Sequence, residues 1–184
     1  MMELRPCPLP GCYEILTPIL QDNRGTFCKT FLKHALQEQG LHTDFPEEFY
    51  STSEKHVIRG LHVQTPPGAT VKMVYCPYGK VFDVLVDLRK GSPTYGTFHS
   101  FLLSPETANE LYIPQGVAHG FCTLSDEAVL VYRASQEYDQ RYDTGIRFDS
   151  LSIPWPSKNP IVSDRDRALP ALSEFVSPFT FSCL

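Results

Sequence analysis

The sequence predicts an all-β fold, a sandwich or barrel with few helices, and three observations lead to this prediction. Sixteen prolines and eleven glycines in 184 residues separate short apolar segments at close intervals, a pattern typical of many short strands joined by turns. The clearest segment is 81–88, where Phe82, Val84 and Val86 share one face, as the two-residue side-chain period of a strand requires. Helix signals are sparse.

Six further segments are expected to form strands, because each is a short apolar run bounded by turn residues. In chain order they are 57–64, 71–76, 96–103, 111–113, 120–124 and 128–134.

Two segments carry helix signals. Residues 30–39 have an amphipathic pattern that Gly40 would close. Ser104-Pro105-Glu106 combines a capping residue, a proline and an acidic residue, which predicts one short turn. Beyond Trp155 the chain is rich in Pro, Ser and Asp, so we expect an irregular tail that wraps around the barrel.

Composition favours one domain that spans residues 1–184 and disfavours several classes of function. The net charge is −5 and no stretch concentrates Lys and Arg, so nucleic-acid binding through a basic face is not expected. No apolar run approaches the roughly 20 residues that span a bilayer, and the first ten residues do not resemble a signal peptide. Six cysteines are scattered without CxxC spacing, which indicates free thiols and a cytoplasmic protein.

An arginine and a histidine lie three positions apart in the apolar segment Val57-Ile58-Arg59-Gly60-Leu61-His62-Val63-Gln64. Arginine binds phosphate well, and histidine accepts protons near neutral pH. Together they indicate a phosphorylated substrate and a proton-transfer reaction; the alternative is that His62 is a hydrogen-bonded core residue. Strand parity places His62 and Gln64 on one face and Arg59 on the other, unless a β-bulge intervenes.

Two charged residues interrupt strands that are otherwise apolar. Lys72 either extends outward along the surface or points into a polar cavity, where its ammonium would stabilise a developing oxyanion. Asp83 is either a partner for such a cation inside the barrel or an exposed residue.

The segment Pro114-Gln115-Gly116-Val117-Ala118-His119 contains Pro-x-Gly-x-x-His, the second sequence motif of cupin barrels, in which a tight turn delivers the histidine to the cavity. The region that corresponds to the first cupin motif offers His62 alone. Two histidines are fewer than the three or four protein ligands of a usual metal site, so we expect no bound metal.

Two tyrosines and one aspartate complete the candidate residues. Tyr132 and Tyr138 lie six positions apart, on the same face of an extended segment, and are either packing aromatics or, with a phenol pKa of about 10, general acids. Asp166, in Ser163-Asp164-Arg165-Asp166, is either solvated or placed behind a histidine, whose tautomer it would then fix.

These motifs occur in the same order in a known family. The chain resembles the dTDP-4-dehydrorhamnose 3,5-epimerase family over nearly its whole length. The matching segments are 22–27, 59–64, Lys72, 82–89, 91–96, 113–121, 124–126 and 163–166.

The resemblance implies a cupin-type jelly roll that works as a homodimer and, without a cofactor, epimerises nucleotide-linked 4-keto-6-deoxy sugars for deoxysugar biosynthesis. It implies that His62 removes a proton beside the C4 ketone and that Asp166 pairs with this histidine. Lys72 would stabilise the enolate oxygen, and Tyr138 would return a proton on the opposite face of the sugar. Inversion requires such a base and acid on opposite faces.

The resemblance also implies a set of substrate-binding residues. They are Arg24, Phe27, Arg59, Gln64, His119 and Tyr132. Arg59 and His119 would lie near the phosphates and the sugar, and Arg24 would reach the diphosphate from the neighbouring subunit.

The chain departs from the family pattern at four positions. Lys29 replaces a glutamate, Phe49 an asparagine, His56 a glycine and Glu137 an aromatic residue. These changes leave open a CDP-, GDP- or UDP-linked substrate, and epimerisation at C3 alone. Two readings from other classes are a metal-dependent cupin and a non-catalytic barrel that binds sugar nucleotides.

Overall fold

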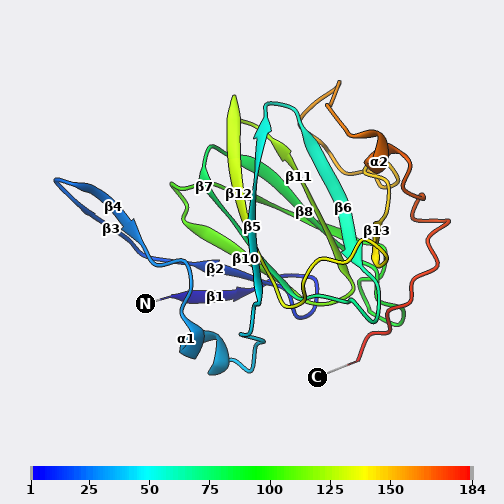
Figure 1. Cartoon of the computed structure of the whole chain (residues 1–184), viewed down its shortest axis with the longest axis horizontal. Helices are drawn as coiled ribbons and strands as arrows, with labels where there is room; N and C mark the ends of the chain where they lie inside the picture. The colour runs from blue at the N-terminus through cyan, green and yellow to red at the C-terminus, as the bar shows by residue number, and fades with distance from the viewer. Residues whose placement is uncertain (1, 183–184) are drawn as a thin grey trace.

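Two antiparallel sheets packed face to face form the body of the protein (Figure 1). This computed structural model describes residues 2–182. The larger sheet has the strand order β1-β2-β10-β7-β12-β5, and the smaller has the order β13-β6-β11-β8-β9. The architecture confirms the predicted all-β jelly roll, with all seven expected strands present.

The bounds of the elements, in chain order, are as follows. They are β1 (Glu3–Pro6), β2 (Tyr13–Leu16), β3 (Ile19–Asp22), β4 (Gly25–Cys28), α1 (Lys33–Gln37), β5 (Glu47–Glu54), β6 (Ile58–Gln64), β7 (Lys72–Tyr78), β8 (Val81–Asp87), β9 (Phe98–Leu103), β10 (Asn109–Ile113), β11 (Val117–Thr123), β12 (Glu127–Ala134), β13 (Asp143–Gly145) and α2 (Asp164–Arg167).

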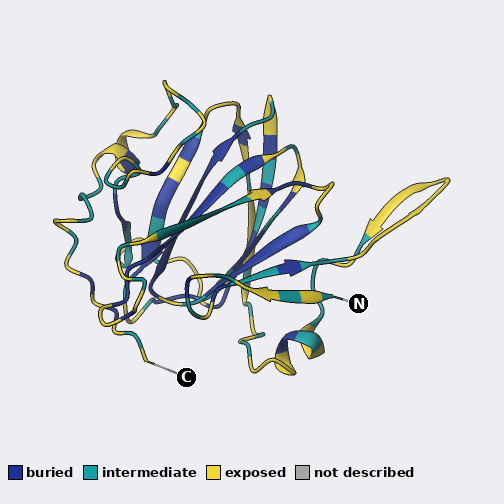
Figure 2. Ribbon diagram, turned by 180° about the vertical axis from the view of Figure 1, so that it is seen from behind, coloured by how far each residue is buried: buried dark blue, intermediate teal, exposed yellow. Residues whose placement is uncertain are grey.

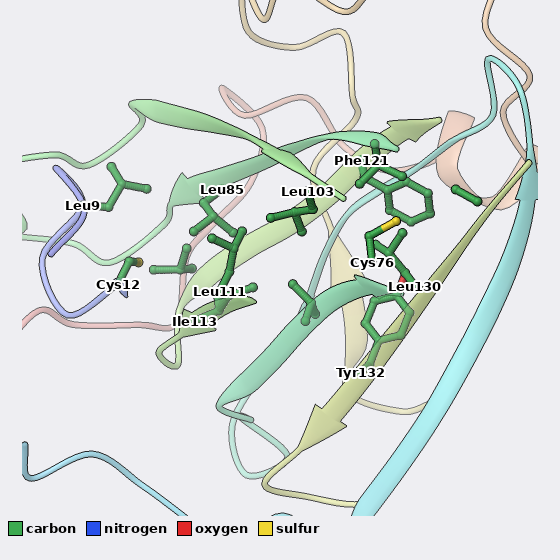
Figure 3. Packing of buried hydrophobic residues seen from close by; sticks show 14 residues of the cluster. Leu9, Cys12, Cys76, Leu85, Leu103, Leu111, Ile113, Phe121, Leu130 and Tyr132 are labelled. Atoms are coloured by element: carbon green, nitrogen blue, oxygen red, sulfur yellow. The ribbon is translucent and has the colours of Figure 1, made fainter. Parts of the chain in front are cut away.

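The space between the sheets holds the main core, part of which Figure 3 shows. Leu85 of β8 packs there against residues of the larger sheet such as Leu111 and Leu130. Val84 and Val86 point to the opposite face of β8, where the C-terminal segment covers them. Because β8 is covered on both sides, both of its faces are apolar, and this explains why its sequence signal was the clearest.

Helix α1 is shorter than the ten residues predicted, because its start lacks a side-chain cap. Leu32 stands at the N-cap and makes no side-chain hydrogen bond to the first turn. The predicted stop is confirmed: Gly40 adopts φ +69, and the Leu41 amide donates to the Leu36 carbonyl at 3.1 Å. This helix and the loop after it cover the outer face of the larger sheet.

Five strands in the first 54 residues were not predicted. Their sequences lack a strong apolar pattern, because β1, β3, β4 and β5 are largely exposed. β3 and β4 form a separate hairpin that projects from the body (Figures 1 and 2), and Leu20 and Phe27 on it are 62% and 60% exposed.

The tail beyond Trp155 is largely irregular, as predicted, and runs over the smaller sheet (Figure 1). It contains the short helix α2, which the Ser163 hydroxyl caps by accepting from the Asp166 amide at 3.1 Å. Neither helix within residues 2–182 has the length and apolar character that a bilayer span requires.

Candidate active site

A β-bulge in β6 places Arg59 and His62 at the same cavity. In the pairing of β6 with β11, His62 lies opposite His119 and Arg59 lies opposite Phe121. Three steps along β6 therefore match two along β11, which is the signature of an inserted residue. Strand parity alone, which places Arg59 and His62 on opposite faces, is therefore wrong here, because the β-bulge that we named as the exception is present.

Two glycines allow β6 and β11 to approach each other at this bulge. Gly60 adopts φ +128, a conformation that side-chain-bearing residues rarely reach. A Cβ at Gly60 would lie 2.5 Å from the Gly120 Cα and 2.9 Å from the His119 carbonyl oxygen. The backbone of the site is therefore built on positions where only glycine fits.

His62 and Asp166 form a hydrogen-bonded pair, as predicted. His62 Nε2 lies 2.7 Å from Asp166 Oδ1, and the Gly60 amide donates to Asp166 Oδ2 at 3.0 Å. Burial alone would raise the pKa of Asp166, but these hydrogen bonds hold it below the ordinary value. A carboxylate in this position favours the tautomer with the proton on Nε2, which leaves Nδ1 free to accept a proton.

A cavity of about 190 Å³ opens beside His62. Its lining residues are Phe49, Ser51, Arg59, His62, Lys72, His119, Phe121 and Tyr132. Lys72 therefore points into a polar cavity, the second of its two predicted orientations. Burial lowers the pKa of its ammonium group, because the charged form is less well solvated in this cavity than in water.

Tyr132 forms one wall of this cavity. Its hydroxyl lies 3.3 Å from Ser51 Oγ, and its ring stacks on Phe49 at 4.7 Å between centroids. Burial raises the pKa of Tyr132 well above the ordinary phenol value. The group is therefore a protonated phenol at neutral pH.

His119 reaches the cavity from β11, as the Pro-x-Gly-x-x-His motif predicts. Its Nε2 lies 2.8 Å from Asp83 Oδ2, and both side chains are buried. Asp83 thus lies inside the barrel, but its partner is His119 rather than Lys72. Asp83 Oδ1 has no hydrogen-bond partner, and burial raises the pKa of this carboxyl group despite the nearby histidine.

A second recess of about 320 Å³ adjoins the first and shares Arg59 and His62 with it. Arg59 is oriented by hydrogen bonds to Ser53 Oγ at 2.9 Å and the Thr52 carbonyl at 3.0 Å. Arg165 also lines this recess. Two guanidinium groups around one recess suit a phosphate. Sequence reasoning missed Arg165, although it directly precedes Asp166.

Tyr138 lies in the segment between β12 and β13, which Gln64 of β6 contacts. The Gln64 Oε1 accepts from the Asp139 amide at 3.1 Å and so anchors the residue next to Tyr138. Tyr138 is 56% exposed, and its hydroxyl donates to Asp143 Oδ2 at 3.1 Å. It is not among the residues that line the 190 Å³ cavity. Asp143, which Arg165 also contacts, was not predicted.

Arg24 and Phe27 lie on the projecting hairpin rather than at the cavity of their own chain. Arg24 pairs with Asp22 on the same hairpin, and both side chains border a recess formed by hairpin residues alone. The structure of one chain therefore does not bring these two predicted residues to the site.

Of the four departures from the family pattern, Phe49 lines the cavity, where it stacks on Tyr132. Lys29, His56 and Glu137 are exposed. Within residues 2–182, no group of three or more His, Cys, Asp or Glu side chains is arranged to hold a metal ion.

Comparison with known proteins gives consistent matches. The sequence model of the family described as dTDP-4-dehydrorhamnose 3,5-epimerase matches residues 6–174. The dTDP-4-dehydrorhamnose 3,5-epimerase of Shigella flexneri is 44% identical over 151 residues, which cover 80% of this chain and 83% of that protein. The dTDP-4-dehydrorhamnose 3-epimerase of Streptomyces niveus is 38% identical over 94% of this chain and 85% of its own.

One solved structure is similar over the full length of both chains. It is a dTDP-6-deoxy-D-glucose-3,5-epimerase from Legionella pneumophila Philadelphia 1 in complex with dTDP-4-keto-L-rhamnose. The TM-score is 0.94, the sequence identity is 31%, and the alignment covers 100% of each chain.

Proposed function

The chain belongs to the dTDP-4-dehydrorhamnose 3,5-epimerase family of isomerases, and from this premise we propose that it inverts C3 and C5 of a dTDP-linked 4-keto-6-deoxyhexose. The C4 ketone acidifies the hydrogens on both neighbouring carbons, because the carbanion formed at either position is an enolate. Inversion then needs a base on one face of the sugar and a proton donor on the other.

The observation that carries the proposal is the shared cavity of His62, Lys72 and Tyr132. His62 acts as the base, because its bond to Asp166 leaves Nδ1 as the acceptor and stabilises the imidazolium once it forms. Lys72 stabilises the enolate oxygen at C4, where a partly desolvated ammonium interacts more strongly than it would in water. Arg59 and Arg165 bind the diphosphate.

We assign the returned proton to Tyr132. The resemblance gives this role to Tyr138, but that side chain is exposed and donates its hydroxyl proton to Asp143. Tyr132, in contrast, is buried and lines the same cavity as His62, where its hydroxyl can return a proton to the sugar. Tyr138, anchored beside Gln64, then serves to cover the bound sugar.

Hydrogen exchange tests the proposed reaction. We expect the protein, incubated with dTDP-4-keto-6-deoxyglucose in D₂O, to replace the hydrogens at C3 and C5 by deuterium, followed by NMR. The same experiment with CDP-, GDP- and UDP-linked sugars tests the preference for dTDP. Nucleotide binding without exchange in any of the four substrates would refute the proposal and support a non-catalytic binding barrel.

Inversion at C3 alone is a second candidate reaction. The relative from Streptomyces niveus, 38% identical to this chain, is a dTDP-4-dehydrorhamnose 3-epimerase. Exchange at C3 without exchange at C5 in the same spectra would identify this reaction.

The two tyrosines are distinguished by matched substitutions. We expect Tyr132→Phe to reduce the rate of epimer formation by about 10²-fold, because the phenylalanine fills the same space but has no proton to return. His62 can still remove the substrate hydrogen, so exchange should continue without inversion. Tyr138→Phe should slow the reaction less than about tenfold. The reverse order of effects would move the acid role to Tyr138.

We also propose that the chain works as a homodimer whose hairpins reach the neighbouring subunit. Arg24 lies on a two-stranded hairpin that also exposes Leu20 and Phe27, and a projecting hairpin of two strands gains stability when such side chains are covered. In a dimer, this surface would be buried and Arg24 could meet the partner's diphosphate. The five free cysteines within residues 2–182 support a cytoplasmic location.

Sedimentation and kinetics test the dimer together. We expect the wild-type protein to sediment as a dimer of 20.8 kDa chains and Leu20→Asp to shift it towards the monomer with loss of activity. Arg24→Ala should remain a dimer while its KM for the dTDP-sugar rises by about tenfold or more. A fully active monomer would contradict this arrangement.

A further inference from the structure

Cys7 and Cys12 face each other across the turn that joins β1 and β2. The register of these strands pairs Pro6 with Tyr13, so the next opposed pair is Cys7 and Cys12, and the Cys7 amide donates to the Cys12 carbonyl at 2.9 Å. The two thiols are near enough for each to shift the pKa of the other. Directly opposed residues of antiparallel strands have Cβ atoms about 4.5–5.5 Å apart, close to the roughly 3.5–4.5 Å of a disulfide.

The two thiols differ in exposure and in pKa, and a stepwise oxidation requires both differences. Cys7 is partly exposed, the Leu9 amide donates to its sulfur at 3.5 Å, and the neighbouring Cys12 thiol lowers its pKa. Cys12 is 1% exposed, and the neighbouring Cys7 thiol together with burial raises its pKa. Cys7 is therefore the more accessible thiol and ionises more readily, and Cys12 is the protected thiol beside it.

We propose that Cys7 and Cys12 are a redox modification site, at which a hydroperoxide converts the two thiols into an intramolecular disulfide. The Cys7 thiolate attacks the peroxide; a sulfur–oxygen bond forms, the oxygen–oxygen bond breaks, and water or an alcohol leaves. Cys12 then attacks the resulting sulfenic acid; the disulfide bond forms, the sulfur–oxygen bond breaks, and water carries away the Cys12 proton. The two sulfurs together lose two electrons, and the peroxide is reduced.

Three other cysteines do not have a lowered thiol pKa. Burial raises the pKa of Cys76 to about 12 and that of Cys122 to about 11, and it also raises the pKa of Cys28. Their thiolate fractions at neutral pH are therefore smaller than that of Cys7. Among the cysteines that the structure describes, peroxide should react first at Cys7.

The turn is already held in the conformation that the bridge requires. Arg89 donates to the Pro10 carbonyl at 2.9 Å, and the same guanidinium is fixed by hydrogen bonds to Asp87. The Cys12 amide donates to the Leu9 carbonyl at 3.1 Å within the turn. The bridge therefore needs only a small local approach of the two Cβ atoms, and a dithiol reductant should open it again.

Peptide mapping tests the proposal. The full chain is treated with increasing hydrogen peroxide, quenched with iodoacetamide and digested with trypsin without reduction. Peptide 1–24 contains Cys7 and Cys12 and no other cysteine, because the Arg5–Pro6 bond resists trypsin. We expect this peptide to lose two hydrogen atoms, to carry no alkyl group, and to regain two alkylation sites after dithiothreitol. Alkylation of both cysteines at peroxide concentrations that already oxidise Cys28 would overturn the proposal.

Substitutions separate the two roles. In Cys12→Ala, which retains a small apolar side chain in the core, Cys7 should stop at the sulfenic acid and be trapped by dimedone. In Cys7→Ala, at the more exposed position, Cys12 should remain a thiol. Cys28→Ser is the matched control and should form the bridge at the wild-type rate. Dimedone labelling at Cys12 in Cys7→Ala would contradict the assignment. None of these readouts depends on the epimerase reaction.

Discussion

His62→Asn is expected to reduce the exchange of the C3 and C5 hydrogens by about 10³-fold, within the usual range for loss of a general base. Asparagine is close to histidine in size, and its amide can still donate to Asp166, which otherwise accepts from His62 at 2.7 Å. It has no group that accepts a proton near neutral pH. The substitution therefore removes the base but keeps the side-chain packing. NMR in D₂O measures the exchange rate of the substrate hydrogens directly.

His99→Asn provides the control for this substitution. His99 lies on β9, half-buried against Phe101 and outside the residues that line the cavity. The His99→Asn variant should exchange the C3 and C5 hydrogens of the substrate at the wild-type rate. If His62→Asn also exchanged normally while its melting temperature stayed unchanged, His62 would not be the base, and the proposed mechanism would fail.

Gly60→Ala is expected to lower the free energy of unfolding by about 3 kcal/mol or more. Two effects add. A φ of +128 is unfavourable for alanine, and the new Cβ would lie 2.5 Å from the Gly120 Cα, a backbone atom that no side-chain rotation can move away. Denaturation in urea measures the loss. Because β6 would have to shift, activity should fall as well.

Gly91→Ala separates these two effects. Gly91 also has a positive φ of +82, but a Cβ there would meet no atom within 4 Å. It should therefore lose only the conformational part, about 1–2 kcal/mol. If both variants lost the same amount, the close approach of β6 and β11 would not constrain the sequence.

The sequence signal for each strand depended on how the strand is buried. β8 and β11 are covered on both faces and read as apolar runs, so they were found, although β11 begins at Val117 rather than Gly120. The strands of the projecting hairpin bury almost no side chain, so nothing in their composition distinguished them from a loop. Exposed strands of this kind are fixed by pairing, which a single sequence does not display.

Some site residues could be predicted from the sequence and others could not, again because of the segments in which they lie. His62 and Lys72 could be found because a polar residue within an apolar strand is conspicuous, His119 because of its Pro-x-Gly-x-x-His motif, and Asp166 because the family resemblance includes its motif. Arg165 and Asp143 lie in polar segments, where a charged residue carries no signal. The roles of Tyr132 and Tyr138 could not be separated from spacing alone, since six positions place both on one face; only the burial of Tyr132 distinguishes them.

The extra residue in β6 has a consequence for which sequence changes this chain can accept. In a perfectly regular ladder, Arg59 and His62 would point in opposite directions, and no single substrate could meet both. Deleting one residue between them would make the pairing of β6 with β11 regular, but it would also turn one of the two side chains away from the cavity and abolish activity. Insertions and deletions between Arg59 and His62 should therefore reduce activity far more than substitutions do, because the active site depends on the β-bulge in β6.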